Sequence, residues 1–304
     1  MTPARLILAC ALCLLAPTLV RAEPVAVTFD DLPLNGALAP GTTRSGITRD
    51  VLEILKKERV PQVYGFINAG RTEGTADGVE ALALWVAGGQ RVGNHTYSHP
   101  DLTRSTFELF EQHVRQNEPV LQLLDRSDAW RWFRYPYLHE GDTLEKRRRV
   151  RAMLKERRYR IAQVTLDYED YLWNNAYARC MSKPADAKAI AWLRSSYLST
   201  AARFIDADRE MAQKVFGREI SHVLLLHLGS YSSTILPDVF RLLRQKGFTL
   251  VTLEQAQADS IYDSDPDFPS SRGGTLLEQW MDARRLEYPA VEGKPYKELE
   301  AICQ

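Results

Sequence analysis

Two carboxylates and two imidazoles in the N-terminal third of this 304-residue sequence have spacings that suit a metal ion. Asp30 and Asp31 directly follow a short apolar segment, and His95 and His99 follow another. Two imidazoles four residues apart can reach one ion from a single helical turn, and two histidines with one carboxylate leave a coordination position open. Because position 96 is Thr where zinc sites of that spacing carry Glu, the spare carboxylate of the Asp pair is the candidate general base. These residues predict one divalent metal ion, with zinc favoured, although an isolated acid pair is also common in turns.

Three later segments carry side chains that could complete such a site. Arg134 could orient a carboxylate, and Pro136 stiffens a turn able to aim the backbone N–H of Tyr137. Asp170 lies in an acidic segment, and His227 ends an aliphatic run where a general acid would be wanted. Taken alone, His227 is better explained as a hydrogen-bonded core histidine. Its interpretation as a catalytic acid rests on the presence of the other candidate site residues.

The five segments each follow a predicted strand. The pattern of apolar residues predicts strands at 25–29, 62–67, 91–93, 130–135, 160–165, 222–226 and 248–252. Helices are expected from a Thr48 cap to Val60, and over 79–87, 103–124, 144–158, 185–216 and 236–245, with Pro119 kinking or dividing the third. Alternating strands and helices favour a parallel sheet, open or closed into a barrel, and such folds build their sites at the carboxyl ends of the strands.

In this order, the segments resemble the polysaccharide deacetylase family, the NodB homology domain of the carbohydrate esterases. The resemblance covers residues 25–253 and rests on Thr-Phe-Asp-Asp at 28–31, His-Thr-x-x-His at 95–99, Arg-x-Pro-Tyr at 134–137 and Leu-Leu-Leu-His at 224–227. It implies an α/β fold, a distorted and incomplete (β/α) barrel of the TIM-like type. We expect a single catalytic domain over 23–258, with a helical insertion at about 172–221 and a C-terminal tail at 259–304 packed on it.

The resemblance also implies roles for individual residues. Asp31, His95 and His99 would bind the metal, Asp30 would be the general base, and His227 would be the general acid. The backbone N–H of Tyr137 would hold the oxyanion, while Arg134 and Asp170 would orient and tune the base and the acid. The fourth motif departs from the family pattern, which usually ends in Trp, because this chain has Tyr171 there and Trp173 two residues on.

The insertion carries the aromatic residues Trp173, Tyr177, Trp192 and Tyr197. They are better explained as the core of an added helical element than as a lid or a substrate platform. The basic run at 146–151 is interpreted as a solvated helix face.

The first 22 residues have the character of a secretory signal peptide: the first five include one Arg and no acid, an apolar run follows at 6–20, and cleavage is expected near Ala22. The run is too short for a membrane-spanning helix, so no stable membrane span is expected and the protein would be exported to a periplasm or secreted. Lys plus Arg equal Asp plus Glu at 39 each, which gives no general field to attract nucleic acid. The sequence does not indicate the oligomeric state.

Two of the four cysteines lie beyond the predicted signal peptide. In an oxidising compartment Cys180 and Cys303 could form a disulfide that ties the tail to the body. Two separate buried thiols are the alternative.

The function predicted is hydrolysis of N-acetyl groups of N-acetylglucosamine-containing glycans such as peptidoglycan, chitin oligomers or an exopolysaccharide. An O-acetyl esterase of the xylan type with the same site, and a non-catalytic exported glycan-binding protein, are the alternatives. A glycosidase with paired carboxylates would leave His95 and His99 without a role. A mononuclear iron oxygenase would not need the neighbouring Asp30 and His227.

Overall fold

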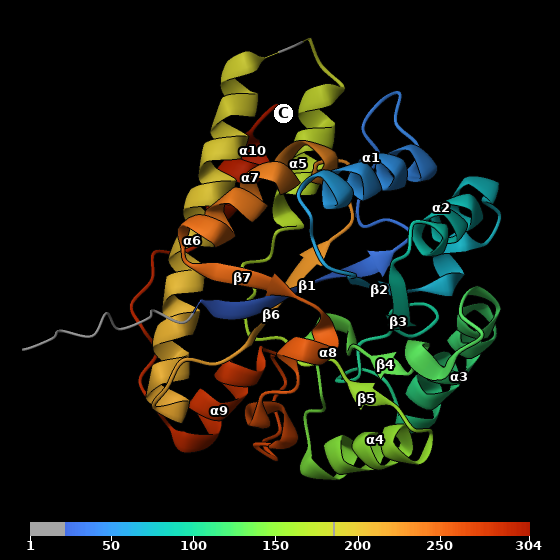
Figure 1. The fold of residues 1–304 in the computed structure, drawn as a ribbon, viewed down its shortest axis with the longest axis vertical. Helices are drawn as coiled ribbons and strands as arrows, with labels where there is room; N and C mark the ends of the chain where they lie inside the picture. Colours follow the sequence, from blue (N-terminus) through green and yellow to red (C-terminus); the bar gives the residue numbers. More distant parts are fainter. Residues whose placement is uncertain (1–21, 185) are drawn as a thin grey trace, which may run out of the picture.

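Seven parallel strands form one curled sheet in the computed structural model, which describes residues 22–184 and 186–304 (Figure 1). The predicted signal peptide falls outside the described residues except for its last position. Along the sheet the strands run β5-β4-β3-β2-β1-β6, and β7 pairs with the first residues of β1. The strands are β1 (Glu23–Leu32), β2 (Tyr64–Ile67), β3 (Arg91–Asn94), β4 (Trp132–Phe133), β5 (Arg160–Ile161), β6 (His222–His227) and β7 (Phe248–Val251).

The two edges of the sheet meet just after β5. The predicted strand over 160–165 is divided: Arg160 and Ile161 pair with β4, and Leu166 forms a parallel bridge with Leu224 of β6. The N–H of Leu225 donates to the carbonyl of Leu166 at 3.1 Å. This closure by a short irregular segment confirms the predicted distorted, incomplete (β/α) barrel in a single domain.

β1 is the central strand. It pairs with β2, β6 and β7, and its residues are buried on both faces except for partly covered Pro24. A strand buried on both faces has an almost continuous run of apolar side chains, and Val25, Ala26, Val27 and Phe29 supply it here. The polar residues at its carboxyl end are therefore held by the most constrained strand of the sheet.

Helices surround the barrel and differ from the expected ones mainly at their ends. Thr43, and not Thr48, caps the first helix, because its hydroxyl accepts from the N–H of Gly46. Pro119 lies inside one continuous helix that begins at Phe107, so the predicted division is wrong. The helices of the barrel are α1 (Arg44–Lys57), α2 (Ala76–Ala87), α3 (Phe107–Leu124), α4 (Leu144–Glu156), α7 (Ser232–Gln245) and the short α8 (Leu253–Ala256).

The insertion consists of two helices, α5 (Leu172–Met181) and α6 (Ala187–Phe216), and α6 is the long helix along one side of the molecule (Figure 1). Trp173 and Tyr197 are buried in the main core, with ring centroids 5.3 Å apart. Tyr177 and Trp192 are partly buried and pack against the same core. The insertion aromatics are thus core residues, as expected.

The C-terminal residues contain two helices that the sequence pattern did not predict, α9 (Leu276–Arg284) and α10 (Tyr296–Ala301). The interpretation of the basic run of α4 as a solvated face holds for Arg148 and Arg149, which are exposed, and is wrong for Arg147, which binds the segment before α9. Arg147 is 1% exposed and pairs with Glu140 at 3.2 Å and with Asp265 at 2.5 Å. These buried ion pairs fix the start of the C-terminal segment on the barrel.

A disulfide joins Cys180 of α5 to Cys303 at the end of the chain, which confirms the pairing hypothesis. The guanidinium of Arg179 donates to the carbonyls of Leu299 and Ile302, at 2.6 and 2.9 Å. The last turn of the chain is therefore fastened to the insertion by a covalent bond and by hydrogen bonds.

Among the described residues, no helix combines the length and apolar character that crossing a bilayer requires.

The disulfide closes a sequence separation of 123 residues, so its loss should be costly. In protein that begins at Glu23, Cys303→Ser should lower the free energy of unfolding by about 2–4 kcal/mol, measured by urea denaturation. A reductant should weaken the unsubstituted protein and leave the variant unchanged. Two titratable thiols in the native, unreduced protein would contradict the pairing.

Candidate active site

The candidate site lies at the carboxyl ends of the barrel strands. Asp30 and Asp31 end β1 and are 2% and 4% exposed. In the parallel pairing of β1 with β6, Asp30 is the register partner of His227. The first and fifth predicted motifs are therefore neighbours in the sheet although 197 positions separate them in the sequence.

Asp31, His95 and His99 converge on one point. Their candidate ligand atoms all lie within 4.8 Å of one another. Asp31 Oδ1 is 3.7 Å from Nε2 of His95 and 3.5 Å from Nε2 of His99. The other ring nitrogen of His95, Nδ1, lies 2.8 Å from the carbonyl of Arg134 and so donates to it, which leaves Nε2 with a free electron pair directed at the carboxylate.

The residues present fit a divalent metal ion. Asp31 Oδ1 is buried and accepts no hydrogen bond, although the Arg71 guanidinium forms an ion pair with it at 3.1 Å. Oδ2 accepts from the amide of Asn35 at 2.6 Å. Two imidazole nitrogens and one free carboxylate oxygen form the donor set of an open zinc site. Burial lowers the pKa of His95 well below its usual value and that of His99 to about 4, so both imidazoles are neutral, as ligands must be.

The two histidines do not lie on a helical turn, which corrects the prediction. The segment from His95 to His99 is an irregular loop in which Thr96 and His99 have left-handed backbone conformations, with φ of 65° and 61°. Buried asparagines hold it: the amide of Asn68 donates to the carbonyls of His95 and Thr96, and Asn94 Oδ1 accepts from the N–H of Thr96. Hydrogen bonds between buried asparagine side chains and the loop backbone thus hold the two histidines in place of a helical turn.

Arg134 lies beside Asp30. Its Nη1 is 3.0 and 3.2 Å from the two carboxylate oxygens, and its Nη2 donates to Thr28 Oγ1 at 3.1 Å. Both partners are buried, and burial raises the pKa of Asp30 to about 6 even though the Arg134 charge opposes that rise. Asp30 is therefore a carboxylate that can take a proton near neutral pH.

Asp170 lies beside His227 and not beside Arg134. Its Oδ1 is 2.7 Å from His227 Nδ1, and its Oδ2 accepts from the His227 backbone N–H at 2.9 Å. Burial lowers the pKa of His227, but the Asp170 carboxylate outweighs it and, with Asp31 and Asp30, raises the pKa to about 9. Tyr171 supplies the aromatic wall of this histidine, with ring centroids 5.1 Å apart, whereas Trp173 points into the core and donates to Ser196.

Tyr137 stands at the mouth of the site. Its ring is 4.4 Å from that of His99, its side chain is 57% exposed, and its φ is 57°. Gly273 of the C-terminal segment packs against its carbonyl, and a Cβ built on Gly273 would lie 2.4 Å from that oxygen. The C-terminal segment therefore supports the turn predicted to carry the oxyanion contact.

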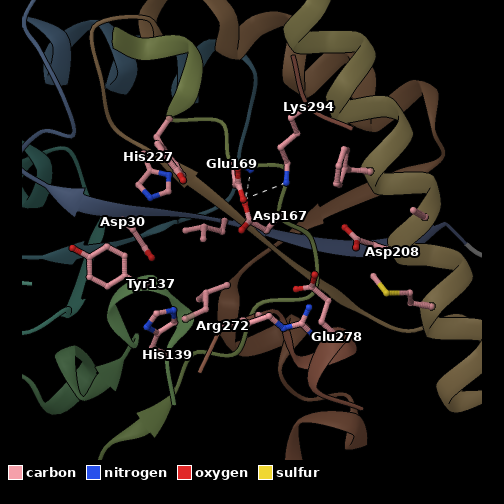
Figure 2. A pocket seen from close by; sticks show the side chains of 18 of the residues that line it. Asp30, Tyr137, His139, Asp167, Glu169, Asp208, His227, Arg272, Glu278 and Lys294 are labelled. Atoms are coloured by element: carbon pink, nitrogen blue, oxygen red, sulfur yellow. Dashed lines mark hydrogen bonds and ion pairs between the residues drawn. The ribbon is translucent and has the colours of Figure 1, made fainter. Parts of the chain in front are cut away.

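Asp30, Asp31, His95, His99, Tyr137 and His227 line one end of a cavity of about 520 Å³. Figure 2 shows Asp30, Tyr137 and His227 at that end, Asp167 and Lys294 in the middle, and Asp208 and Glu278 at the other end. The far wall comes from α6 and the C-terminal segment, and sequence reasoning did not assign it to the site. A signal for Asp208 was present, because it interrupts an apolar stripe of α6 that repeats at Ala201, Ile205, Ala212 and Val215.

Comparisons with known sequences point to one family. A family model described as "Polysaccharide deacetylase" matches residues 20–160. A chitooligosaccharide deacetylase of Rhizobium leguminosarum bv. trifolii is 32% identical over 113 residues, covering 34% of this chain and 46% of that protein. A chitin deacetylase of Arthroderma benhamiae is 24% identical over 147 residues, covering 48% of this chain and 35% of that protein. The matches therefore span less than half the length of these curated relatives.

Solved structures share the fold at low sequence identity. A variant of peptidoglycan deacetylase PdaC from Bacillus subtilis has a TM-score of 0.51 and 18% identity, covering 78% of this chain and 91% of that chain. The chitin deacetylase of Colletotrichum lindemuthianum has a TM-score of 0.51 and 22% identity, covering 77% and 86%. BA3943 of Bacillus anthracis, described as a CE4 family pseudoenzyme, has a TM-score of 0.52 and 16% identity, covering 78% and 66%. Since this fold also occurs in a pseudoenzyme, catalysis has to be argued from the site residues.

The contact between Asp170 and His227 gives a prediction that needs no substrate. Asp170→Asn should lower the pKa of the His227 imidazole by about one to two pH units, because a hydrogen bond between two charged groups is lost while burial still favours the neutral ring. NMR titration of the metal-free protein measures this. Asp206→Asn, an exposed position paired with Lys246, is the control and should leave the titration unchanged. An unaltered midpoint in the Asp170 variant would show that another group sets the charge of His227.

Proposed function

This chain belongs to the polysaccharide deacetylase family, and on that premise we propose that it hydrolyses N-acetyl groups of N-acetylglucosamine-containing glycans outside the cytoplasm. The observation that carries the proposal is the convergence of an open metal-ligand set with a buried carboxylate and a partly buried histidine in one cavity. The names of the relatives, deacetylases of chitin and of chitooligosaccharides, support an N-acetyl substrate. The predicted signal peptide supports export.

The metal would be held by Asp31, His95 and His99. A divalent ion in such a site, with zinc favoured, supplies Lewis-acid chemistry, because it acidifies water and polarises a carbonyl. The hydrogen bond from His95 Nδ1 to the Arg134 carbonyl keeps this ring in the tautomer that binds through Nε2. Asn35 orients the Asp31 carboxylate.

Asp30 acts as the general base. It takes a proton from the attacking water, and its pKa near 6 places it as a carboxylate at neutral pH. Arg134 holds it in position through the two contacts at 3.0 and 3.2 Å. The backbone N–H of Tyr137 then donates to the oxyanion that forms as the acetyl carbon becomes tetrahedral.

His227 acts as the general acid. The leaving group is a sugar nitrogen, which departs poorly unless it is protonated. With a pKa near 9, His227 carries a proton at neutral pH and can donate it from Nε2, because Nδ1 is engaged with Asp170. The base Asp30 and the acid His227 are register partners on the adjacent strands β1 and β6, so both would face the acetamide group that is hydrolysed.

The first experiment measures acetate release from N-acetylglucosamine oligomers by protein lacking residues 1–22. A chelator should abolish acetate release and added zinc should restore it, because no side chain at the site can replace the metal ion as the Lewis acid. Asp30→Asn should lower the rate by about 10²–10⁴-fold, the contribution of a general base. Asp206→Asn should leave the rate unchanged.

Failure of this assay leads to the alternatives. If folded, zinc-loaded protein releases acetate from acetylated xylan and none from the N-acetylated oligomers, the O-acetyl esterase function replaces the proposal. If it releases acetate from neither but binds the oligomers, it is a non-catalytic glycan-binding protein.

A further inference from the structure

The cavity extends beyond the proposed metal site into a part lined by carboxylates. Asp167 follows the segment that closes the barrel, Asp208 lies on α6, and Glu278 lies on α9, and all three line the cavity. We call these three residues the acidic compartment. Two of the elements that build it, α6 and α9, pack against each other.

Asp208 is the group that points to a ligand. It is 4% exposed, and its Oδ2 has no hydrogen-bond partner. Figure 2 shows its carboxylate directed from α6 into the cavity. A buried carboxylate oxygen without a partner costs free energy in the unliganded protein, so its retention indicates a group that pairs with it when bound.

The cations near the compartment are engaged elsewhere. Lys294 pairs with Glu169 at 3.4 Å and lies over the Phe204 ring at 4.3 Å. Arg272 pairs with Asp282 at 2.9 Å. Within the described part of the chain, no Lys, Arg or His nitrogen lies within ion-pair distance of Asp167, Asp208 or Glu278, and Lys294 acts on Asp167 and Asp208 only from a longer distance.

The geometry suits an organic cation better than a metal ion. Among the described residues, Asp31, His95 and His99 are the one group of three whose ligand atoms converge within 4.8 Å, and the acidic compartment does not converge in this way. The Asp208 carboxylate can accept one N–H from an ammonium group, which carries three donors, while the other two carboxylates add negative charge around it.

We propose that the acidic compartment binds the ammonium group of a de-N-acetylated amino sugar adjacent to the sugar that is deacetylated. The proposal rests on the proposed function and names its substrate class, a partially deacetylated glycan. The amine produced by the reaction arises beside His227, whereas Asp208 and Glu278 lie at the opposite end of the same cavity and Asp167 lies between, so the recognised ammonium belongs to a neighbouring sugar. The chain would then act preferentially on glycans that already carry free amines.

The protonation of the compartment agrees with this assignment. Burial raises the pKa of Asp208 well above its usual value, with further contributions from Glu278 and Asp167, and burial raises the pKa of Asp167 to about 6. These carboxylates resist ionising together while no cation is present. A bound ammonium would remove that repulsion.

Calorimetry on metal-free protein tests the binding without turnover. The probes are the two mixed disaccharides of glucosamine and N-acetylglucosamine, in either order, and the diacetylated disaccharide as reference. The protein should bind one mixed disaccharide about tenfold or more tightly than the reference, as a charged hydrogen bond predicts, and the preference should weaken with salt.

Two variants identify the residues responsible. Asp208→Asn should reduce the preference to about one, and Glu278→Gln should reduce it while keeping the helix cap that Glu278 forms with Thr275. Asp206→Asn makes the same change on α6 at an exposed position and should retain the full preference. Thermal melts of each variant establish that it is folded.

Equal binding of the mixed and diacetylated disaccharides would overturn the proposal, and so would a preference that survives in the folded Asp208 variant. The outcome is separable from that of the proposed function. Acetate release without any preference for the amine would support the deacetylase function and overturn ammonium binding by the acidic compartment. Preferential amine binding without acetate release would support the acidic compartment and overturn the deacetylase function.

Discussion

The buried guanidinium of Arg134 is the contact on which the rest of the site depends. It is 1% exposed, and it donates to Asp30 and Thr28 of β1 and to the carbonyl of Ala162 after β5. A charge inside a barrel is tolerated only when it is paired and its donors are satisfied, so the ends of these strands must meet in one register. The carbonyl of the same residue accepts from His95 Nδ1 and thereby couples the proposed base to the proposed metal ligands.

The sequence predicted the parts of the fold that local pattern determines. The continuous aliphatic run of β6 and the β-branched start of β1 identified the two central strands, and the polar residues after them identified the carboxyl edge of the sheet. Ordered motifs brought together Asp30, Asp31, His95, His99 and His227 before any geometry was known. The end of each element was less certain, as the Thr43 cap shows, because several residues near a helix start can serve as caps.

Features set by distant contacts were not predictable in the same way. The loop that carries His95 and His99 owes its left-handed residues to Asn68 and Asn94, and asparagines in a strand end or a loop carry no pattern that indicates such a partner. The closure of the barrel through Leu166 and Leu224 joins positions 58 apart and leaves only a two-residue β5. The C-terminal wall of the cavity depends on ion pairs between α4 and residues more than 100 positions away.

The anchoring of that wall explains how the chain can keep an unpaired buried carboxylate. Asp208 lowers the stability of the ligand-free protein because its Oδ2 is buried in the packed stripe of α6 without a hydrogen-bond partner. The elements around it are held independently, by the Cys180–Cys303 disulfide at one end of the C-terminal segment and by Arg147 with Asp265 at the other. A segment fastened at both ends cannot move to relieve this cost, whereas the proposed ammonium ligand would offset it. A buried polar atom without a partner, held in place by rigid surroundings, is typical of a site preorganised for binding.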